Sequence, residues 1–363
     1  MMFVSLKSLA VLSTLIAFGL SATISPLSDP NNKPERVCRL TPLGLGKDDT
    51  DQFEPKYEYW LKPENTYRVV FIQSQASWFV VTGSDFVIDA HKTGGIDGNG
   101  QPWWNHYTSA PRRDGDGRPI SFTLWRAKNA LIKDFKILSP PFWANAIAES
   151  EDVVYDGMFV NATNTDERWF GQSVVWNTDG IDTYRSSGIT MKNWDITCGD
   201  DCIAIKGNSS KIIARDFICR GGTGVAFGSL GQYAGLIYFK AWDGAIAGTP
   251  PTGGGGGRGL VRNAVFRNFV FDRVQTGFQI VQNFGAPPGD VPVTSLVKLE
   301  KMKFENIRGT TNESTIVRFE CSSVVGCSDI QFRNVKVTGP PNGTDEYICE
   351  YTKNLTGLPA PCN

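Results

Sequence analysis

The sequence is poor in the residues that build metal sites and nucleic-acid surfaces. Only two of its 363 residues are histidine, and neither joins the eight cysteines in a metal-ligand spacing. The net charge is −1, so the strong positive field of a protein that grips phosphates is absent. After the first two dozen residues, no apolar run is long enough to span a membrane. We therefore expect neither a metal, nor a nucleic acid, nor a membrane as a partner.

The first residues have the order of a secretory signal. Lys7 precedes an apolar run from Leu9 to Leu20, and the small residues Ser21 and Ala22 follow. The run is about half the length that a membrane span requires, which favours export over anchoring. We predict a signal peptide over residues 1–22 and an extracellular protein over residues 23–363. The alternative interpretation of this segment is an apolar first helix.

Cysteines and glycosylation sequons agree with export. The even number of cysteines suits disulfides in an oxidising compartment; they are Cys38, Cys198, Cys202, Cys219, Cys321, Cys327, Cys349 and Cys362. Five acceptor sequons for N-linked sugar are present; they begin at Asn161, Asn208, Asn312, Asn342 and Asn354.

A repeated phrase indicates the fold. Short stretches of alternating apolar and polar residues end at Asn or Asp followed by another apolar residue, as at Asp134-Phe135, Asn193-Trp194, Asp216-Phe217, Asn268-Phe269, Asn306-Ile307 and Asn334-Val335. The step from Asn193 to Asp216 is 23 residues and that from Asn306 to Asn334 is 28, which matches one coil of a solenoid.

We therefore predict an all-β protein, a single-stranded parallel β-helix. Its coils would stack strand on strand around an apolar core, with ladders of buried Asn. A β-sandwich is the rival, but few tight hairpin signals separate the strands. Pro250-Pro251-Thr252 and the five glycines after them predict a mobile loop; a phosphate-binding loop would need a Lys-Ser/Thr ending that is missing.

Two acidic phrases are the candidate site. They are Asn177-Thr178-Asp179-Gly180-Ile181-Asp182 and Gly199-Asp200-Asp201-Cys202-Ile203-Ala204-Ile205-Lys206. Asp179 precedes Asp200 and Asp201 by 21 and 22 residues, about one coil. Stacked strands lie roughly 4.8 Å apart, so we expect the three carboxylates to crowd together.

Crowded carboxylates repel one another, which raises the pKa of at least one and keeps it protonated. Such an acid, beside a carboxylate that attacks or activates water, is what glycoside hydrolysis requires. Either phrase alone would more often be a capped turn or a calcium ligand pair. Their spacing by one coil favours the catalytic interpretation.

These phrases, together with Gly228-Ser229-Leu230-Gly231-Gln232-Tyr233, resemble family 28 of the glycoside hydrolases, the polygalacturonases and rhamnogalacturonases. The likeness begins near Gly46-Lys47-Asp48-Asp49-Thr50-Asp51 and continues through Ile96-Asp97-Gly98-Asn99-Gly100 into the C-terminal coils. The resemblance implies a right-handed β-helix, an inverting mechanism, a pectic polysaccharide as substrate and no cofactor. It assigns Asp200 as general acid, and Asp179 and Asp201 as the residues that hold and activate water. Their carboxyl groups should then be about 6.5–9.5 Å apart. We expect the protein to act as a monomer.

Three positions depart from the family pattern. Thr223 stands where the family has histidine, and Tyr238-Phe239-Lys240 stands where it has Arg-Ile-Lys. Only Lys240 of the two cations that grip a galacturonate carboxylate remains; Tyr238 can stack on a sugar but carries no charge. We expect an uncharged leaving-side sugar such as rhamnose. Tyr238, Lys240 and Trp242 resemble an exo-acting fungal subgroup of galacturan galacturonidases and exo-rhamnogalacturonases.

The chain is also shorter than the family pattern in two places, after Asp51 and between Gln232 and Lys240. A missing coil would leave an apolar edge. By position in the family pattern, Cys202 pairs with Cys219, Cys321 with Cys327 and Cys349 with Cys362, which leaves Cys38 and Cys198.

The leading hypothesis is an exo-acting, inverting hydrolase that releases galacturonate from galacturonan or rhamnogalacturonan. The alternatives are a silent pectin-binding β-helix that kept its acids by descent, and a lyase that relies on calcium and a basic residue.

Overall fold

The computed structural model describes residues 3–5, 22–25, 38–40, 57–60, 62–70, 75–109, 118–228, 235–242, 258–284 and 293–362. Two compact units make up the chain, Met1–Gly222 and Thr223–Asn363. Most of the predicted signal peptide lies outside the described residues, as do Asp51, Gln232 and the glycine-rich segment 250–257. No helix in the described ranges is long and apolar enough to cross a membrane.

The first unit is built almost wholly of strands. Its elements are β1 (Phe3–Ser5), β2 (Ala22–Ser25), β3 (Cys38–Leu40), α1 (Tyr57–Trp60), η2 (Pro63–Asn65), β4 (Tyr67–Val70), β5 (Gln75–Ser77), β6 (Val80–Asp89), β7 (Gly95–Asp97), α2 (Gly100–Ser109), β8 (Phe122–Lys133), β9 (Lys136–Leu138), β10 (Asn145–Ala148), β11 (Glu151–Asp156), β12 (Phe159–Asn161), η3 (Glu167–Trp169), β13 (Ile181–Tyr184), β14 (Ser187–Thr197), β15 (Ile203–Ile205) and β16 (Ile213–Arg220).

The second unit contains strands β17 (Val225–Phe227), β18 (Gly235–Trp242), β19 (Arg258–Arg267), β20 (Val270–Val274), β21 (Thr276–Phe284), β22 (Leu296–Thr311), β23 (Thr315–Glu320), β24 (Cys327–Thr338), β25 (Glu346–Glu350) and β26 (Thr352–Thr356).

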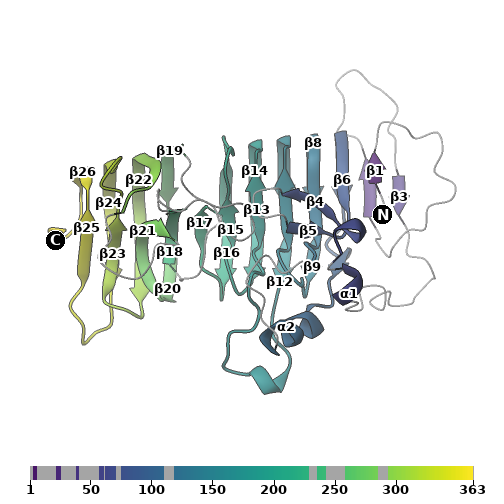
Figure 1. Ribbon diagram of the computed structural model, residues 1–363, viewed down its shortest axis with the longest axis horizontal. Coiled ribbons are helices and arrows are strands. Elements are labelled where there is room, and N and C mark those ends of the chain that lie inside the picture. Colours follow the sequence, from purple (N-terminus) through teal and green to yellow (C-terminus); the bar gives the residue numbers. More distant parts are fainter. Residues whose placement is uncertain are drawn as a thin grey trace. The chain divides into compact units, whose positions relative to one another are not determined.

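Strands from successive coils pair in parallel within each unit (Figure 1). In the first unit β6, β8, β11, β14 and β16 form one such stack. In the second unit β18, β21, β23 and β25 form one stack, and β19, β22, β24 and β26 another. Antiparallel pairs join β2 to β3 and β6, and β4 to β5. The predicted coils are therefore present.

Residues in register stack into the core. Ile132, Tyr155 and Met191 occupy one register position on β8, β11 and β14, and each is fully buried. In the second unit the Phe304 ring stacks on those of Phe266 and Phe332, with ring centres 5.1 and 4.8 Å apart. Because each coil repeats the same inward positions, the apolar core continues through each unit.

The Asn or Asp that ends the repeated phrase adopts a left-handed backbone conformation. The φ angle is 59° at Asn193, 53° at Asn306 and 51° at Asn334, and Asn tolerates this region better than most residues do. Asn334 Nδ2 donates to Asn306 Oδ1 over 3.0 Å. The predicted Asn ladder therefore exists, but the prediction that it is buried was wrong, because these side chains are exposed. The ladder lies at the surface, within strands β14, β22 and β24.

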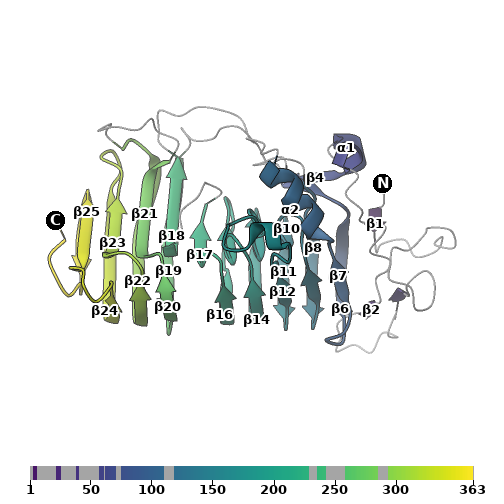
Figure 2. The same ribbon diagram turned by 90° about the horizontal axis from the view of Figure 1, so that it is seen from below.

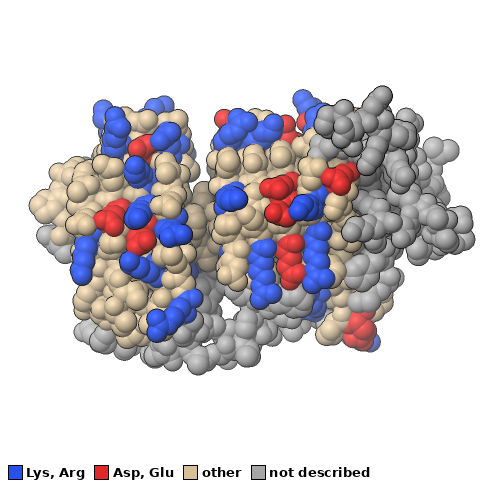
Figure 3. Space-filling model, turned by 90° about the horizontal axis from the view of Figure 1, so that it is seen from above, with Lys and Arg blue, Asp and Glu red and all other residues tan. Residues whose placement is uncertain are grey.

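Opposite charges also stack on the surface. Lys133 Nζ lies 3.1 Å from Asp89 Oδ2, and Lys192 Nζ lies 2.9 Å from Asp156 Oδ2. Figure 3 shows basic and acidic side chains side by side on one face of each unit. At these positions opposite charges on neighbouring coils attract each other.

One strand edge in each unit is apolar. β16 pairs with β14 on one side, and its Ile213 and Ile218 are about half exposed, at 54% and 50%. β19 pairs with β22, and its Leu260 and Val265 are exposed to a similar degree. Whether a coil is missing stays a prediction, because the segment with Gln232 lies outside the described residues.

Candidate active site

The three predicted carboxylates lie together at the start of two paired strands. Asp179 precedes β13, while Asp200 and Asp201 precede β15. Ile181 and Ile203 are in register, and the Gly180 N–H donates to the Asp201 carbonyl over 2.9 Å. One carboxylate oxygen from each Asp lies within 4.8 Å of the others. Spacing by one coil therefore predicted this cluster correctly.

Glycines permit the close approach of the strands around the cluster. A Cβ at Gly180 would lie 2.4 Å from the Cys202 carbonyl oxygen, and one at Gly199 would lie 2.4 Å from the Val175 carbonyl oxygen. Neither distance is possible for a real side chain. The glycines of both acidic phrases are thus required by packing rather than by turn conformation.

Asp179 holds a proton more readily than an ordinary Asp. Its side chain is buried, and Oδ1 has no hydrogen-bond partner among the described residues. Burial raises the pKa of Asp179 well above its usual value, and the negative charges of its acidic neighbours add to the rise, whereas Lys206 opposes it. The sequence led us to expect that repulsion between the carboxylates would raise the pKa. Desolvation by burial is the larger cause of the rise.

Asp200 is surrounded by N–H donors. The backbone N and side-chain Nδ2 of Asn177 donate to Oδ2 over 3.3 and 3.1 Å. The Asp201 backbone N donates to Oδ1 over 2.9 Å. These bonds fix the orientation of the carboxylate.

Arg118 holds Asn177 in place and was not predicted. Its Nη2 donates to Asn177 Oδ1 over 3.0 Å, and its Nη1 donates to the Trp176 and Pro141 carbonyls. The guanidinium also lies over the Phe142 ring, 5.0 Å from its centre. Arg118 stands in no recognisable motif; a fully buried arginine is visible only in the structure.

A buried ion pair lies beside the cluster. Lys206 Nζ is 2.8 Å from Asp182 Oδ1, with side-chain exposures of 3% and 0%. Lys206 also lies 4.4 Å from the centre of the Trp143 ring. Burial raises the pKa of Asp182 to about 7, although Lys206 lowers it in part. Both residues stand in the acidic phrases, but the sequence did not predict their pairing.

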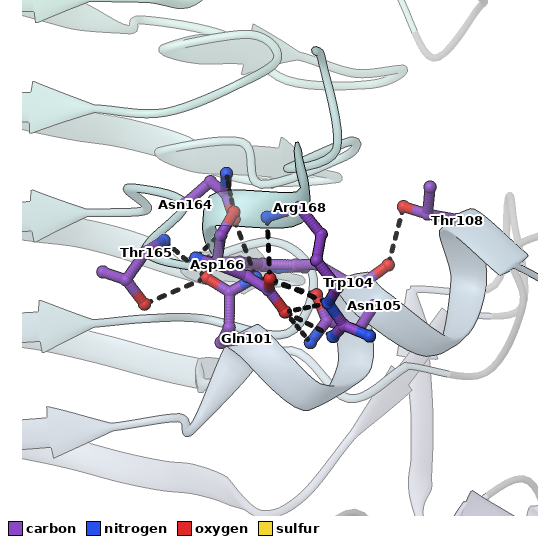
Figure 4. A network of polar contacts seen from close by, with 8 residues as sticks. All are labelled: Gln101, Trp104, Asn105, Thr108, Asn164, Thr165, Asp166 and Arg168. Carbon is purple, nitrogen blue, oxygen red and sulfur yellow. Dashed lines mark hydrogen bonds and ion pairs between the residues drawn. The ribbon is translucent and has the colours of Figure 1, made fainter. Parts of the chain in front are cut away.

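Helix α2 holds the segment that leads into Asn177. Figures 1 and 2 show this helix beside the loop between β12 and β13. Gln101 Oε1 accepts from the Thr165 N–H, and Asn105 Nδ2 donates to Asp166 Oδ2 over 2.9 Å (Figure 4). Asp166 caps η3 by accepting from the Arg168 N–H. These hydrogen bonds hold the loop between β12 and β13 against α2. The bonded residues of that loop come before Asn177 and Asp179 in the sequence.

Disulfides form as the resemblance predicted. Cys202 is bonded to Cys219, Cys321 to Cys327 and Cys349 to Cys362. Cys198 is a free, buried thiol, and its Sγ lies 3.5 Å from Cys202 Sγ. The Cys38 side chain lies outside the described part of the chain.

The predicted substrate-binding residues belong to the second unit. Tyr238 and Lys240 are buried on β18, with Lys240 Nζ 5.3 Å from the centre of the Tyr238 ring. Thr223 is half-buried before β17. The structure brings Tyr238 and Lys240 together; their role towards the three carboxylates stays a prediction. Glycosylation also stays a prediction, with Asn161 half-buried and four exposed acceptors, Asn208, Asn312, Asn342 and Asn354.

The cluster has the spacing of a cation site as well as that of an acid–base site. Burial raises the pKa of Asp179 and so favours its neutral form. A neutral carboxyl group binds a cation poorly, so we assign proton chemistry to Asp179. Two oxygens up to 4.8 Å apart can both accept from one water, since each hydrogen bond spans about 2.8 Å. The nearest carboxylate oxygens, within 4.8 Å of one another, are closer than the separation of about 6.5–9.5 Å that was expected between the carboxyl groups.

Comparisons with known proteins identify the family. Residues 61–358 match the family described as "Glycosyl hydrolases family 28". The chain is 36% identical to "Putative galacturan 1,4-alpha-galacturonidase A" of Aspergillus niger, over 90% of this chain and 82% of that protein. It is 32% identical to "Alpha-L-rhamnosidase rgxB" of the same species, over 83% and 73%.

A solved structure shares the fold. The endo-xylogalacturonan hydrolase of Aspergillus tubingensis superposes with a TM-score of 0.66 at 20% identity, covering 85% of this chain and 82% of that one. Together with the parallel stacks, this likeness confirms the predicted all-β class, the right-handed parallel β-helix.

Proposed function

The chain belongs to family 28 of the glycosyl hydrolases, and from that premise we propose that it is an exo-acting, inverting hydrolase of pectic polysaccharide. The family confirms the predicted enzyme class, a glycosidase of the polygalacturonase type. We propose that the enzyme releases galacturonate from the end of a galacturonan or rhamnogalacturonan chain.

The observation that carries the proposal is the cluster of Asp179, Asp200 and Asp201. One group must give a proton to the leaving oxygen while others hold the attacking water. Asp200 is the proposed acid, and Asp179 and Asp201 the proposed water-holding pair. In the free protein, burial and the negative charges of its neighbours raise the pKa of Asp179. The assignment therefore requires that the proton reside on Asp200 when substrate is bound.

The leaving-side sugar is proposed to be uncharged. Tyr238 offers a ring and no charge, and Lys240 lies against that ring. A site with a single ammonium group beside an aromatic ring suits a neutral sugar better than a site with a bidentate arginine does. The relatives named for galacturonidase and rhamnosidase activity support both sugars as neighbours in the substrate.

The protein is also proposed to be exported as a monomer after loss of residues 1–22. Three disulfides among the described residues support an oxidising compartment. Mass spectrometry of the protein from culture medium should find an N-terminus near residue 23. Full-length protein retained in cells would contradict export.

A silent pectin-binding β-helix is the second candidate. It is favoured by the exposed apolar edges of β16 and β19, which suggest a lost coil. Binding to pectin without any product would support it.

Product chromatography tests the leading proposal. The enzyme should be incubated with homogalacturonan and with rhamnogalacturonan of defined ends. Monomeric galacturonate as the first product supports exo action, and its release mainly from rhamnogalacturonan supports the argument from Tyr238. A ladder of oligomers would refute exo action, and unsaturated products would indicate a lyase.

A further inference from the structure

Asp182 and Lys206 continue the same strand pair that carries the three acids. Asp182 is in register with Ala204 on β15, and Lys206 N donates to the Thr183 carbonyl over 2.9 Å. Their side chains meet at 2.8 Å and are sealed from solvent. The charges of Asp182 and Lys206 both act on Asp179, the buried member of the cluster.

Lys206 is held so that its charge stays in this site. Its ammonium contacts Asp182 on one side and the Trp143 ring on the other. Trp143 in turn stacks on Phe142, with ring centres 5.1 Å apart. A lysine that is 3% exposed cannot turn its charge towards water, so its field acts on the neighbouring carboxylates at low dielectric.

The charged and titratable groups near Asp179 are few. Across β10, the Ala144 N–H donates to the Asp179 carbonyl, and that contact is neutral. Among the described residues, the charges that act most strongly on Asp179 are those of Asp182, Asp200, Asp201 and Lys206, and Asp179 in turn acts on the Cys198 thiol after β14. Lys206 is the cation in this set, while Arg118 binds the neighbouring Asn177 and Trp176.

We propose that Lys206 and Asp182 are positioning residues for Asp179, with Lys206 supplying the positive charge that lets Asp179 ionise and hold the attacking water. This inference rests on the proposed hydrolase function. Neither residue is proposed to touch the sugar, because both side chains are sealed from solvent. Asp182 holds Lys206 in place and offsets part of its charge.

The sign of the effect follows from electrostatics. A nearby cation favours the charged form of a carboxyl group, so removal of Lys206 should favour neutral Asp179. The limb of kcat/KM that reports ionisation of Asp179 should then move to higher pH by about one unit, the lower end of the shift that a nearby opposite charge produces. At a fixed pH below the limb, kcat/KM of the variant should be about tenfold lower than that of the parent for each pH unit by which the limb has moved.

The sharpest experiment compares Asp182→Asn with Asp182→Asn/Lys206→Met. Neither variant has a charge at position 182, so the comparison isolates the charge of Lys206. The double variant also removes the buried Lys206 charge that Asp182→Asn leaves without its partner carboxylate, which protects its folding. Its acid limb should lie higher than that of Asp182→Asn, and Lys206→Arg should keep the parent limb. Equal limbs in the two variants would overturn the proposal.

Urea unfolding between pH 4 and pH 8 gives a readout that needs no activity. A group whose pKa is raised on folding loses its stabilising contribution as pH rises through the folded pKa. Without Lys206 the folded pKa of Asp179 should be higher still. The stability of the double variant should therefore go on falling to a higher pH than the stability of Asp182→Asn does. A parent enzyme that cleaves no pectic substrate would refute the proposed function, whereas identical unfolding profiles would refute the role of Lys206.

Discussion

Asn177 donates two hydrogen bonds to one carboxylate oxygen of Asp200, from its backbone N and its side-chain Nδ2. Arg118 orients the same amide through its Oδ1. The arrangement links a fully buried cation to the proposed general acid through one neutral side chain. It determines where the Asp200 carboxylate points and leaves the cluster oxygens within 4.8 Å of one another.

Asn177→Gly should lower kcat about tenfold to a hundredfold, because a hydrogen bond to a charged group contributes roughly 1.5–3 kcal/mol. Glycine accepts the left-handed φ of 54° at this position, so the backbone is not strained. Asn193→Gly is the matched control, at φ 59° on the exposed ladder. Initial rates of sugar release measure the effect. Equal rates in both variants would show that the link to Asp200 is dispensable.

Asp179→Asn should remove part of the pH dependence of stability. The raised pKa of Asp179 means that the folded parent binds a proton more tightly than the unfolded chain does. The parent therefore loses stability as pH rises from the unfolded pKa of about 3.9 through the higher folded pKa. Chemical denaturation at several pH values should show a smaller loss in the variant. A larger loss would contradict the direction of the shift.

Gly180→Ala should destabilise the paired strands beneath the cluster by about 1–3 kcal/mol, the usual cost of overpacking. The added Cβ would meet the Cys202 carbonyl oxygen at 2.4 Å. Gly207→Ala is the control, because a Cβ there meets nothing within 4 Å. Urea denaturation of both proteins provides the comparison. Equal stabilities would mean that β13 and β15 can separate without cost.

Activity should persist in EDTA. Asp179 is assigned to proton chemistry, and no proposed step uses a cation. Rates measured after exhaustive dialysis against the chelator should match those of untreated enzyme. Loss of activity that added calcium restores, with ultraviolet-absorbing unsaturated product, would favour the lyase alternative instead.

The fold and the acid cluster could be predicted because both depend on sequence periodicity. The phrase that ends at Asn193 or Asn306 recurs once per coil, since each coil needs a left-handed turn at the same place. The step of one coil between Asp179 and Asp201 then places them side by side. The ladder was predicted to be buried because periodicity does not say which face of a turn meets solvent.

The supporting residues could not be predicted in the same way. Arg118 lies far from Asn177 in sequence, and its contacts depend on how three coils pack. Lys206 and Asp182 were visible as charged residues within motifs. Their pairing depends on the burial of both side chains. Charged residues are usually exposed, so the sequence gives no sign of this burial.

The most direct test of the catalytic role of the three carboxylates is the hydrolysis rate of Asp200→Asn beside that of Asp216→Asn, with the anomer of the first-formed sugar followed by NMR. Asp216 is an exposed residue of β16 at φ 61°, a conformation that Asn accepts. We predict that Asp216→Asn keeps the parent rate and releases sugar with inverted configuration, while Asp200→Asn loses at least a hundredfold, roughly the share of general acid catalysis. Equal rates for the two variants, or a retained anomer, would contradict the account.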